Sequence, residues 1–303
     1  MTFLVYLLVY PILWLISRLP FRLLYALSDG VFFLLYYAIG YRKTVVRENL
    51  ALVFPDKAVS ERIRIEKAFF KHMCDMFLEM IKTMGISHAQ LQKRFTFENL
   101  EVLHKLEAQQ KSVMVMYPHY ASWEWSIALS AHIMSKGYGI YQVLENKYFD
   151  NLVRSIREKF GATLIGTTRT RDVISRNKRN GQLSMYGILS DQSPMPQKAQ
   201  LWAEFMGIRV PVHTGAESLC RKHDLPAVFL KVKKVKRGYY SGAFHVISEN
   251  PNSEKEFAIS KGFLALVEQS IKEAPEYYFW THKRWKHRDK NPEDYLPFAP
   301  KGR

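Results

Sequence analysis

The spacing of apolar and polar residues changes along the chain and predicts an apolar N-terminal region followed by a mixed domain. Residues 1–17 contain no charged side chain, and a second apolar run covers residues 31–39. Residues 61–84 show the apolar stripe of an amphipathic helix. We expect His72 and Glu79, which lie in this helix, to face solvent.

Beyond residue 110 short apolar runs alternate with amphipathic segments. Such alternation predicts an α/β fold with a mixed, largely parallel sheet flanked by helices. We expect strands at residues 112–117, about 139–144, 162–165 and 183–190. We expect one helix to start near residue 122 and two others to cover residues 148–160 and 171–179. A hairpin (226–235 and 239–247) and a helix (254–272) follow.

The N-terminal region has the composition of a membrane-associated segment. No basic stretch precedes the first run and no small-residue cleavage site follows it, which favours an uncleaved anchor over a secretory signal. Arg42, Lys43 and Arg47 come next, which places the following domain in the cytoplasm. We therefore predict membrane helices in residues 1–45 and one domain in residues 46–303. Two buried core helices are the alternative, and whether the runs span the bilayer or lie flat stays open.

The charge balance indicates an acidic partner. Lys and Arg number 44 against 28 Asp and Glu, which gives a formal net charge of +16. Nucleic acid, anionic lipid headgroups, a phosphorylated substrate and an acidic carrier protein all fit such a surface. The basic stretch 231–237 suits a lipid headgroup region or a solvated face. Cys74 and Cys220 are the two cysteines and predict neither a disulfide framework nor a cysteine zinc site.

The segment MYPHYASWEW (residues 116–125) carries the candidate chemistry. His119 follows an expected strand, and Glu124 stands five residues later. On one continuous helix the two side chains would diverge, but Pro118 and an N-cap at Ser122 would form a turn that lets them meet. Glu124 would then fix the imidazole tautomer so that His119 acts as a general base. A histidine with an ordinary structural role in the loop is the alternative.

The sequence contains no motif for other common reaction types. It has no Gly-x-Ser-x-Gly elbow, no phosphate-binding glycine loop and no His-Glu-x-x-His pair. We therefore predict neither a metal nor a cofactor. Chemistry in which the substrate's own hydroxyl is the nucleophile remains, and acyl transfer is of this kind. Asp191 and His119 both follow expected strands, where ligands bind in open α/β sheets. The flanking residues Tyr117, Tyr120, Trp123 and Trp125 suggest an apolar cleft.

An ordered set of motifs resembles a known family. The His-x₄-Glu turn is followed by Asn146–Asp150 running into Arg154 and Arg157, then by Asp191-Gln192, Phe205–Gly207, Thr214-Gly215 and the segment 278–288. Together they resemble the bacterial lipid A late acyltransferases of the lysophospholipid acyltransferase superfamily.

The resemblance implies a glycerol-phosphate acyltransferase-like fold and an enzyme of the bacterial inner membrane whose catalytic domain faces the cytoplasm. Such an enzyme would move an acyl chain from an acyl carrier protein thioester, or a coenzyme A thioester, to a hydroxyl of a lipid A precursor. The resemblance also implies that His119 and Glu124 are catalytic. It further implies substrate-binding roles for Arg157, the nearby Arg154, and the pair Asp191 and Gln192.

The chain departs from the family pattern in the expected acceptor region. Relatives often have an acidic residue at the position of Ser193 and an arginine at that of Gln142. An acyltransferase for a lysophospholipid or amino-acid lipid is therefore one alternative, and a thioesterase is another. A non-catalytic, membrane-tethered basic protein is a third, although the sequence has no RNA-binding motif and we expect no nucleic acid partner.

Overall fold

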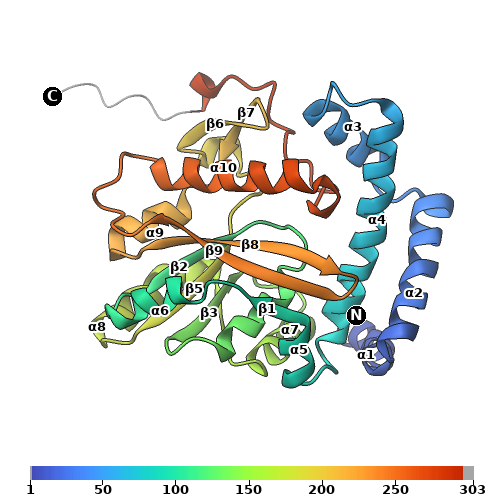
Figure 1. Cartoon of the computed structure of the whole chain (residues 1–303), viewed down its shortest axis with the longest axis horizontal. Coiled ribbons are helices and arrows are strands. Elements are labelled where there is room, and N and C mark those ends of the chain that lie inside the picture. The colour runs from blue at the N-terminus through green and yellow to red at the C-terminus, as the bar shows by residue number, and fades with distance from the viewer. Residues whose placement is uncertain (1, 296–303) are drawn as a thin grey trace.

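A seven-stranded sheet forms the centre of the protein, of which the computed structural model describes residues 2–295. The strand order is β1-β9-β8-β2-β5-β3-β4 (Figure 1). Within this sheet only β8 and β9 are antiparallel neighbours. The prediction of a mixed, largely parallel sheet is therefore confirmed. The strands are β1 (Phe95–Phe97), β2 (Val113–Tyr117), β3 (Lys136–Tyr141), β4 (Thr163–Gly166), β5 (Ser184–Leu189), β8 (Ala227–Lys236) and β9 (Tyr239–Ser248).

Helices flank the sheet, and in Figure 1 α10 lies above β8 and β9 while α6 lies below them. Strand β2 is central, and its residues 113–116 are buried, as expected for an apolar strand covered on both faces. The flanking helices are α5 (His88–Arg94), α6 (Glu101–Ala108), α7 (Lys147–Glu158), α8 (Thr170–Arg179), α9 (Gly215–His223) and α10 (Ala258–Glu273).

Some boundaries differ from the predicted ones. Strand β3 begins three residues earlier than expected, because Gly137 and Gly139 obscure the strand pattern. The side chains of neighbouring residues fill the space beside both glycines. A hairpin of β6 (Leu201–Phe205) and β7 (Ile208–Val212) was not expected. Its turn places Met206 and Gly207 at positive φ.

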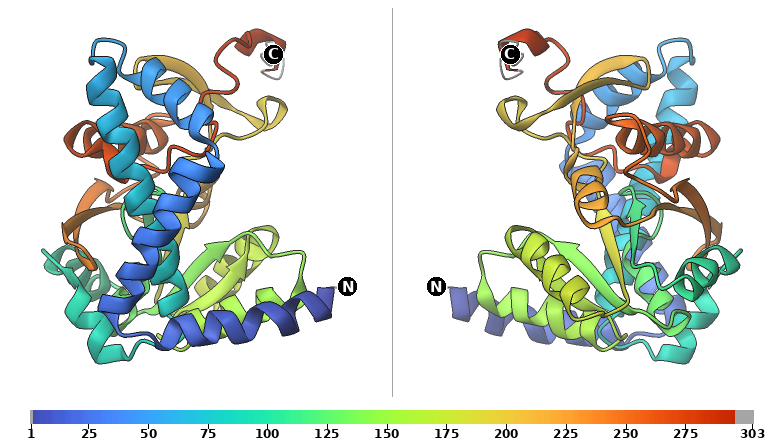
Figure 2. Two further views of the ribbon diagram at one scale, coloured as in Figure 1. Left: turned by 90° about the vertical axis from the view of Figure 1, so that its right-hand side faces the viewer. Right: turned by 90° about the vertical axis from the view of Figure 1, so that its left-hand side faces the viewer.

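The N-terminal region consists of helices packed along one side of the domain. They are α1 (Thr2–Arg18), α2 (Phe21–Phe33), the π-helix η1 (Leu34–Ile39), α3 (Lys43–Val53) and α4 (Val59–Lys82). Figure 2 shows α1 and α2 on the outside of this side, with α4 further in. Among the described residues, Phe21–Ile39 is a helix long and apolar enough to cross a membrane, whereas α1 is shorter.

The expectation that His72 and Glu79 face solvent is wrong. Their exposed fractions are 4% and 1%. Helix α4 packs against α2 on one side and contacts the β8–β9 hairpin on the other, which covers both residues, while Arg64, Lys67 and Lys71 of α4 stay exposed. Glu79, for example, accepts a hydrogen bond from Tyr25 of α2 and another from Tyr240 of β9. These two polar positions of α4 are therefore interior positions.

Candidate active site

Two adjacent parallel strands bring His119 and Asp191 together. Strands β2 and β5 pair in register, with Tyr117 opposite Leu189. His119 and Asp191 each lie two residues beyond this last pair, at the carboxyl edge of the sheet. The carboxyl edge is the usual position for ligand-binding groups in such sheets.

The His119 ring bonds to Asp191. Its Nδ1 lies 2.8 Å from Asp191 Oδ1. Burial raises the pKa of the Asp191 carboxyl, but the His119 ring and its hydrogen bonds lower it further, so the net shift is downward. The carboxylate is therefore ionised, and Nδ1–H donates to it. The amide nitrogen of Gln192 lies 3.4 Å from Nε2 and can donate to its lone pair. This arrangement leaves Nε2 as the basic nitrogen of the ring.

Glu124 bonds to an arginine rather than to the histidine, so the expectation that Glu124 orients His119 is wrong. The Nε and Nη2 atoms of Arg157 each lie 2.7 Å from a Glu124 carboxylate oxygen. Burial lowers the pKa of Arg157, but the attraction of Glu124 outweighs it and the net shift is upward. Both oxygens of Glu124 thus accept from a planar guanidinium, which leaves the imidazole to Asp191.

The turn between the two expected catalytic residues forms differently from the prediction. Ala121 adopts a positive φ of 50°, and a 3₁₀ helix, η2 (Glu124–Ala131), begins at Glu124. Its N-cap position is Trp123, without a side-chain cap, so the expected cap at Ser122 is not formed. Glu124 does lie in the first helical turn, as predicted. The reversal needed after β2 therefore comes from the backbone at Ala121.

A C-terminal segment holds this turn in place. We call residues 277–282 the C-terminal strap. The Ala121 N–H donates to the Tyr277 carbonyl at 2.9 Å, and the Phe279 N–H donates to the His119 carbonyl at 3.1 Å. Asn49 of α3 donates in turn to the carbonyl of Trp280 at 2.8 Å. The strap thus holds the backbone of this turn, and α3 holds the strap.

His72 of α4 contacts the same turn. Burial and the nearby Lys234 ammonium lower its pKa well below the usual value, so the ring is neutral. Lys234 Nζ lies 3.1 Å from Nδ1 and donates to it, which leaves the proton on Nε2. Nε2 lies 3.4 Å from the Ala121 carbonyl. His72 of α4 thereby contacts Ala121, the residue of the turn with positive φ.

The expected aromatic cleft is only partly formed. Trp123 and Phe279 lie beside the His119 ring, with centroid distances of 5.2 Å and 6.2 Å. Tyr120 and Trp125 are core residues instead, and their polar atoms bond inward to backbone and side-chain groups. The His119 side chain remains 19% exposed, so a substrate can reach it.

Arg154 also lies on α7, near Arg157 in sequence but with other partners. Its Nη1 donates to the Tyr141 hydroxyl at 3.0 Å. Tyr141 ends β3, next to β5 in the sheet. The structure therefore places Arg154 at the carboxyl edge of the sheet without bringing it into the Glu124 pair.

Sequence reasoning did not single out His282 and Arg284 as site residues. The Ser193 N–H donates to His282 Nε2 at 3.3 Å, and burial lowers the pKa of His282 to about 4. Arg284 is 1% exposed and donates to the Ser193 hydroxyl and the Pro211 carbonyl. The only sign of them in the sequence was their position just after the aromatic residues 277–280. Within residues 2–295, no cluster of three or more His, Cys, Asp or Glu side chains could hold a metal ion.

Residues 1–287 match the family model described as bacterial lipid A biosynthesis acyltransferase. The chain belongs to this family. It is 25% identical over 285 residues to a lipid A biosynthesis palmitoleoyltransferase of Escherichia coli, with 91% of this chain and 89% of the relative covered. It is 22% identical over 279 residues to the lauroyltransferase of the same organism, covering 91% and 90%. A Haemophilus influenzae lipid A biosynthesis acyltransferase is 21% identical over 274 residues, covering 88% and 82%. The protein is thus an acyltransferase of lipid A biosynthesis, and the resemblance inferred from the motifs is confirmed.

Proposed function

We propose that this acyltransferase moves a fatty acyl chain from an acyl carrier protein thioester to a hydroxyl of a lipid A precursor, at the cytoplasmic face of the bacterial inner membrane. Coenzyme A is the alternative donor. The observation that carries the proposal is the His119–Asp191 pair, which lies at the carboxyl edge of the sheet in a chain of this family.

In the proposed reaction His119 Nε2 accepts the proton of the acceptor hydroxyl. The hydroxyl oxygen attacks the thioester carbonyl, and the carbonyl π electrons move onto its oxygen. When the tetrahedral intermediate collapses, the C–S bond breaks and the imidazolium returns its proton to the leaving thiolate. Asp191 stabilises the imidazolium while the ring carries the extra proton. General base catalysis of this kind typically raises the rate by roughly 10² to 10⁴.

We assign to Arg157 the binding of a substrate phosphate or carbonyl oxygen. Its guanidinium is held by Glu124 through Nε and Nη2, and its Nη1 is not part of that pair. A planar cation with a fixed orientation suits such an oxygen. In this proposal Glu124 is essential because it fixes Arg157, and Arg154, Asp191 and Gln192 complete the substrate-binding edge.

The partners follow from charge and from the family. A formal net charge of +16 suits an acidic carrier protein, a phosphorylated glycolipid and an anionic membrane surface. We propose residues 1–45 as the membrane-associated part and residues 46–303 as the acyltransferase domain. The atypical positions of the acceptor region have other roles here: Ser193 bonds the Arg284 carbonyl, and Gln142 accepts from Thr167.

A transfer assay tests the proposal. Purified protein in detergent is given labelled acyl carrier protein and a lipid A precursor, and the product is identified by mass spectrometry. We expect His119→Ala and Glu124→Ala each to nearly abolish transfer while circular dichroism stays unchanged. His245→Ala, which removes an exposed histidine on β9, is the matched control and should retain wild-type activity. If His119→Ala transfers as well as the wild type, the mechanism is wrong. If the wild type acylates a lysophospholipid and not the lipid A precursor, the acceptor is wrong.

A further inference from the structure

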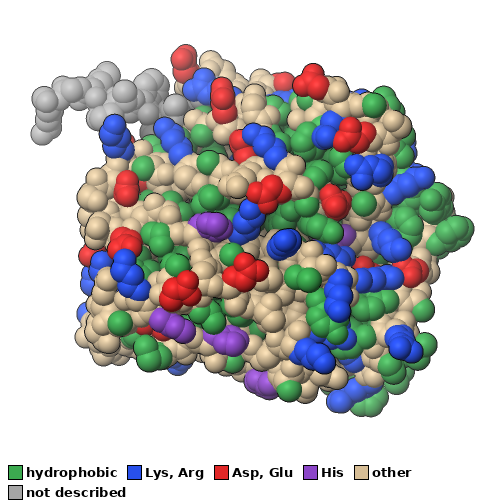
Figure 3. All heavy atoms as spheres, viewed as in Figure 1, with side chains coloured by type: hydrophobic (Ala, Val, Ile, Leu, Met, Phe, Trp, Pro, Cys, Tyr) green, Lys and Arg blue, Asp and Glu red, His purple; other side chains and the backbone are tan. Residues whose placement is uncertain are grey.

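The outer side of α1, α2 and η1 exposes an unusual number of large apolar side chains. Figure 3 shows part of this surface as hydrophobic atoms at the right edge, next to blue basic side chains. We call it the apolar face. Its members, all at least 37% exposed, include Phe3, Leu4, Val5, Leu7, Leu8, Ile12, Trp14, Leu15, Leu23, Leu27, Phe33, Leu34, Tyr37 and Ile39. A surface this large and apolar requires a partner.

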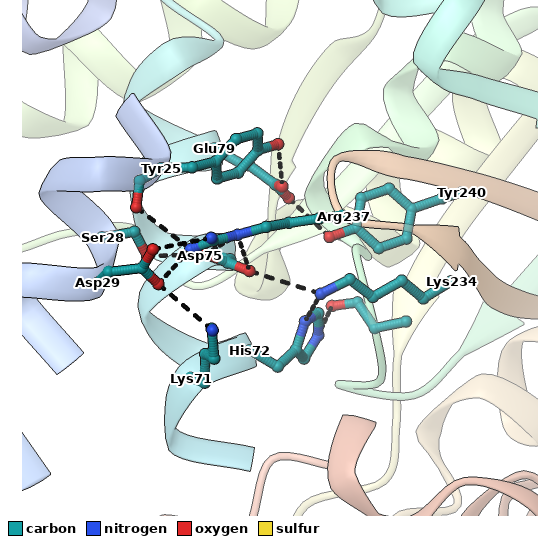
Figure 4. Close-up of polar contacts among 11 residues, drawn as sticks. Tyr25, Ser28, Asp29, Lys71, His72, Asp75, Glu79, Lys234, Arg237 and Tyr240 are labelled. Atoms are coloured by element: carbon teal, nitrogen blue, oxygen red, sulfur yellow. Dashed lines mark hydrogen bonds and ion pairs between the residues drawn. The ribbon is translucent and has the colours of Figure 1, made fainter. Parts of the chain in front are cut away.

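The opposite side of α2 is polar and is bonded to the folded domain. Asp75 of α4 accepts hydrogen bonds from Ser28 and from Arg237 of the β8–β9 hairpin (Figure 4). Arg237 also pairs with Asp29 at 2.8 Å. Tyr25 donates to Glu79 at 2.8 Å. We call these six residues the polar clasp: Tyr25, Ser28, Asp29, Asp75, Glu79 and Arg237. Figure 4 also draws their neighbours Lys71, His72, Lys234 and Tyr240.

The polar clasp bears on whether α2 crosses the bilayer. Asp29 lies near the middle of the apolar segment Phe21–Ile39. If this segment spanned the membrane, Asp29 would lie at the bilayer centre, where a charged side chain is costly. Arg237 and Asp75 would then either lose their partner or enter the hydrocarbon with it.

Helix α1 is bonded to the domain independently of the polar clasp. Lys82 of α4 donates to the carbonyls of Ser17 and Leu19, both at 2.7 Å. The ammonium thus binds the C-terminal end of α1, where the helix dipole favours a cation. At the other end, Tyr6 lies 5.5 Å from Phe149 of α7 in ring centroid distance. The joint between α1 and α2 is therefore held against the domain and cannot lie across a bilayer from it.

The charges around the apolar face favour an anionic lipid surface over a second copy of the chain. Arg18 and Arg22 flank the joint, and Arg42 follows the second segment, all three exposed. A twofold pairing of α2 segments in opposite directions would bring these like charges together, which is unfavourable. Anionic headgroups would instead surround the buried apolar side chains with opposite charge.

We propose that α1, α2 and η1 bind one leaflet of an anionic bilayer through the apolar face, that neither helix spans the membrane, and that the polar clasp and Lys82 keep them on the domain. The proposal rests on the proposed membrane location and is independent of the acyl-transfer chemistry. It places the α1–α2 joint in the headgroup region of the cytoplasmic side, the side on which the active site also lies.

Cysteine labelling in membranes tests this topology. Pro20→Cys places a thiol at the exposed joint, and Thr44→Cys is the matched control after the second segment; native Cys74 and Cys220 are buried. We expect an impermeant maleimide to label both variants in inside-out vesicles and neither in intact spheroplasts. Labelling of Pro20→Cys from the periplasmic side, or its protection from both sides, overturns the proposal.

Flotation with preformed phosphatidylethanolamine and phosphatidylglycerol vesicles is the second test and needs no cysteine variant. We expect the purified wild type to bind, and Arg22→Ala to bind about fivefold more weakly, as follows from about 1 kcal/mol per basic residue near the surface. Arg179→Ala, at the exposed end of α8, should bind like the wild type. If the protein does not float and forms a dimer without detergent, a second copy covers the face. Transfer activity measured in detergent shows separately whether the proposed function stands.

Discussion

The hydrogen bond from His119 to Asp191 gives a prediction that separates the structure from the motif. Replacing Asp191 by Asn keeps the shape of the side chain but removes the charge and can present an N–H donor to Nδ1. The ring would then carry its proton on Nε2, the atom that accepts the substrate proton in the proposed reaction. The nearby Gln192 amide would lose its acceptor in the same step.

The expected magnitude follows from the geometry. At 2.8 Å and an effective dielectric constant of about 20, a full charge pair interacts by about 6 kcal/mol. Part of this is lost to relaxation, since the His119 side chain is 19% exposed. We expect kcat to fall by about 10³ to 10⁴, or roughly 4 to 5.5 kcal/mol in activation free energy.

The transfer assay measures this effect at saturating acyl donor. Glu217→Gln is the matched control, because it removes the charge of another buried carboxylate, on α9, that is not part of the His119 site. A folded Asp191→Asn variant within tenfold of the wild type would refute the assigned role of Asp191. If Glu124→Gln alone removed the activity in that case, the original interpretation from the motif would be the better one.

Other variants test the arginine pair and the polar clasp. Arg157→Lys cannot bond both oxygens of Glu124 and should lower kcat/KM about 100-fold, with Arg157→Gln lower still, in the same assay. Arg237→Ala removes the nearest cation from the buried Asp75 carboxylate, which keeps Ser28 and the more distant Lys234, and should cost about 1.5 to 3 kcal/mol in urea unfolding. Lys233→Ala should change stability by about 0.5 kcal/mol or less. Burial raises the pKa of Glu79 to about 7. The folded state therefore holds this proton more tightly than the unfolded state, and stability should fall by roughly 3 kcal/mol as the pH rises from about 4.5 to 7. Glu79→Gln should flatten that fall in unfolding curves measured across this range.

The sequence predicted the parts of the site that depend on local pattern. The apolar run before Pro118 predicted β2, and the rule that ligands bind at the carboxyl ends of strands placed His119 and Asp191 at one edge. Their pairing was not predictable, since it depends on β2 and β5 being neighbours, and strand order is not visible in the pattern. The five-residue spacing of His119 and Glu124 suggested a direct contact that the structure does not have.

The polar clasp shows a second limit of sequence reasoning. His72 and Glu79 were interpretable as solvated positions because charged residues on helices usually are. Their burial follows from two elements far away in the chain, α2 and the β8–β9 hairpin, which cover α4 together. The basic stretch 231–237 held the complementary signal: Lys234 and Arg237 turn inward toward Asp75, while their neighbours Lys233 and Lys236 are exposed. Matching charges between distant segments requires the tertiary fold.

The C-terminal strap has a consequence for folding. The strap binds the turn across a long stretch of chain, since the Phe279 N–H donates to the His119 carbonyl. The neighbouring Tyr120 likewise donates to the Ser270 carbonyl 150 residues later. The strap depends in turn on Asn49, which lies 231 residues before Trp280. Contacts of such high contact order form slowly, because loop closure must precede them. The β2–β5 ladder can therefore form before the backbone around the imidazole is fixed. In the proposed mechanism, a chain with its sheet in place but its strap undocked would lack the fixed turn at His119 and would be inactive.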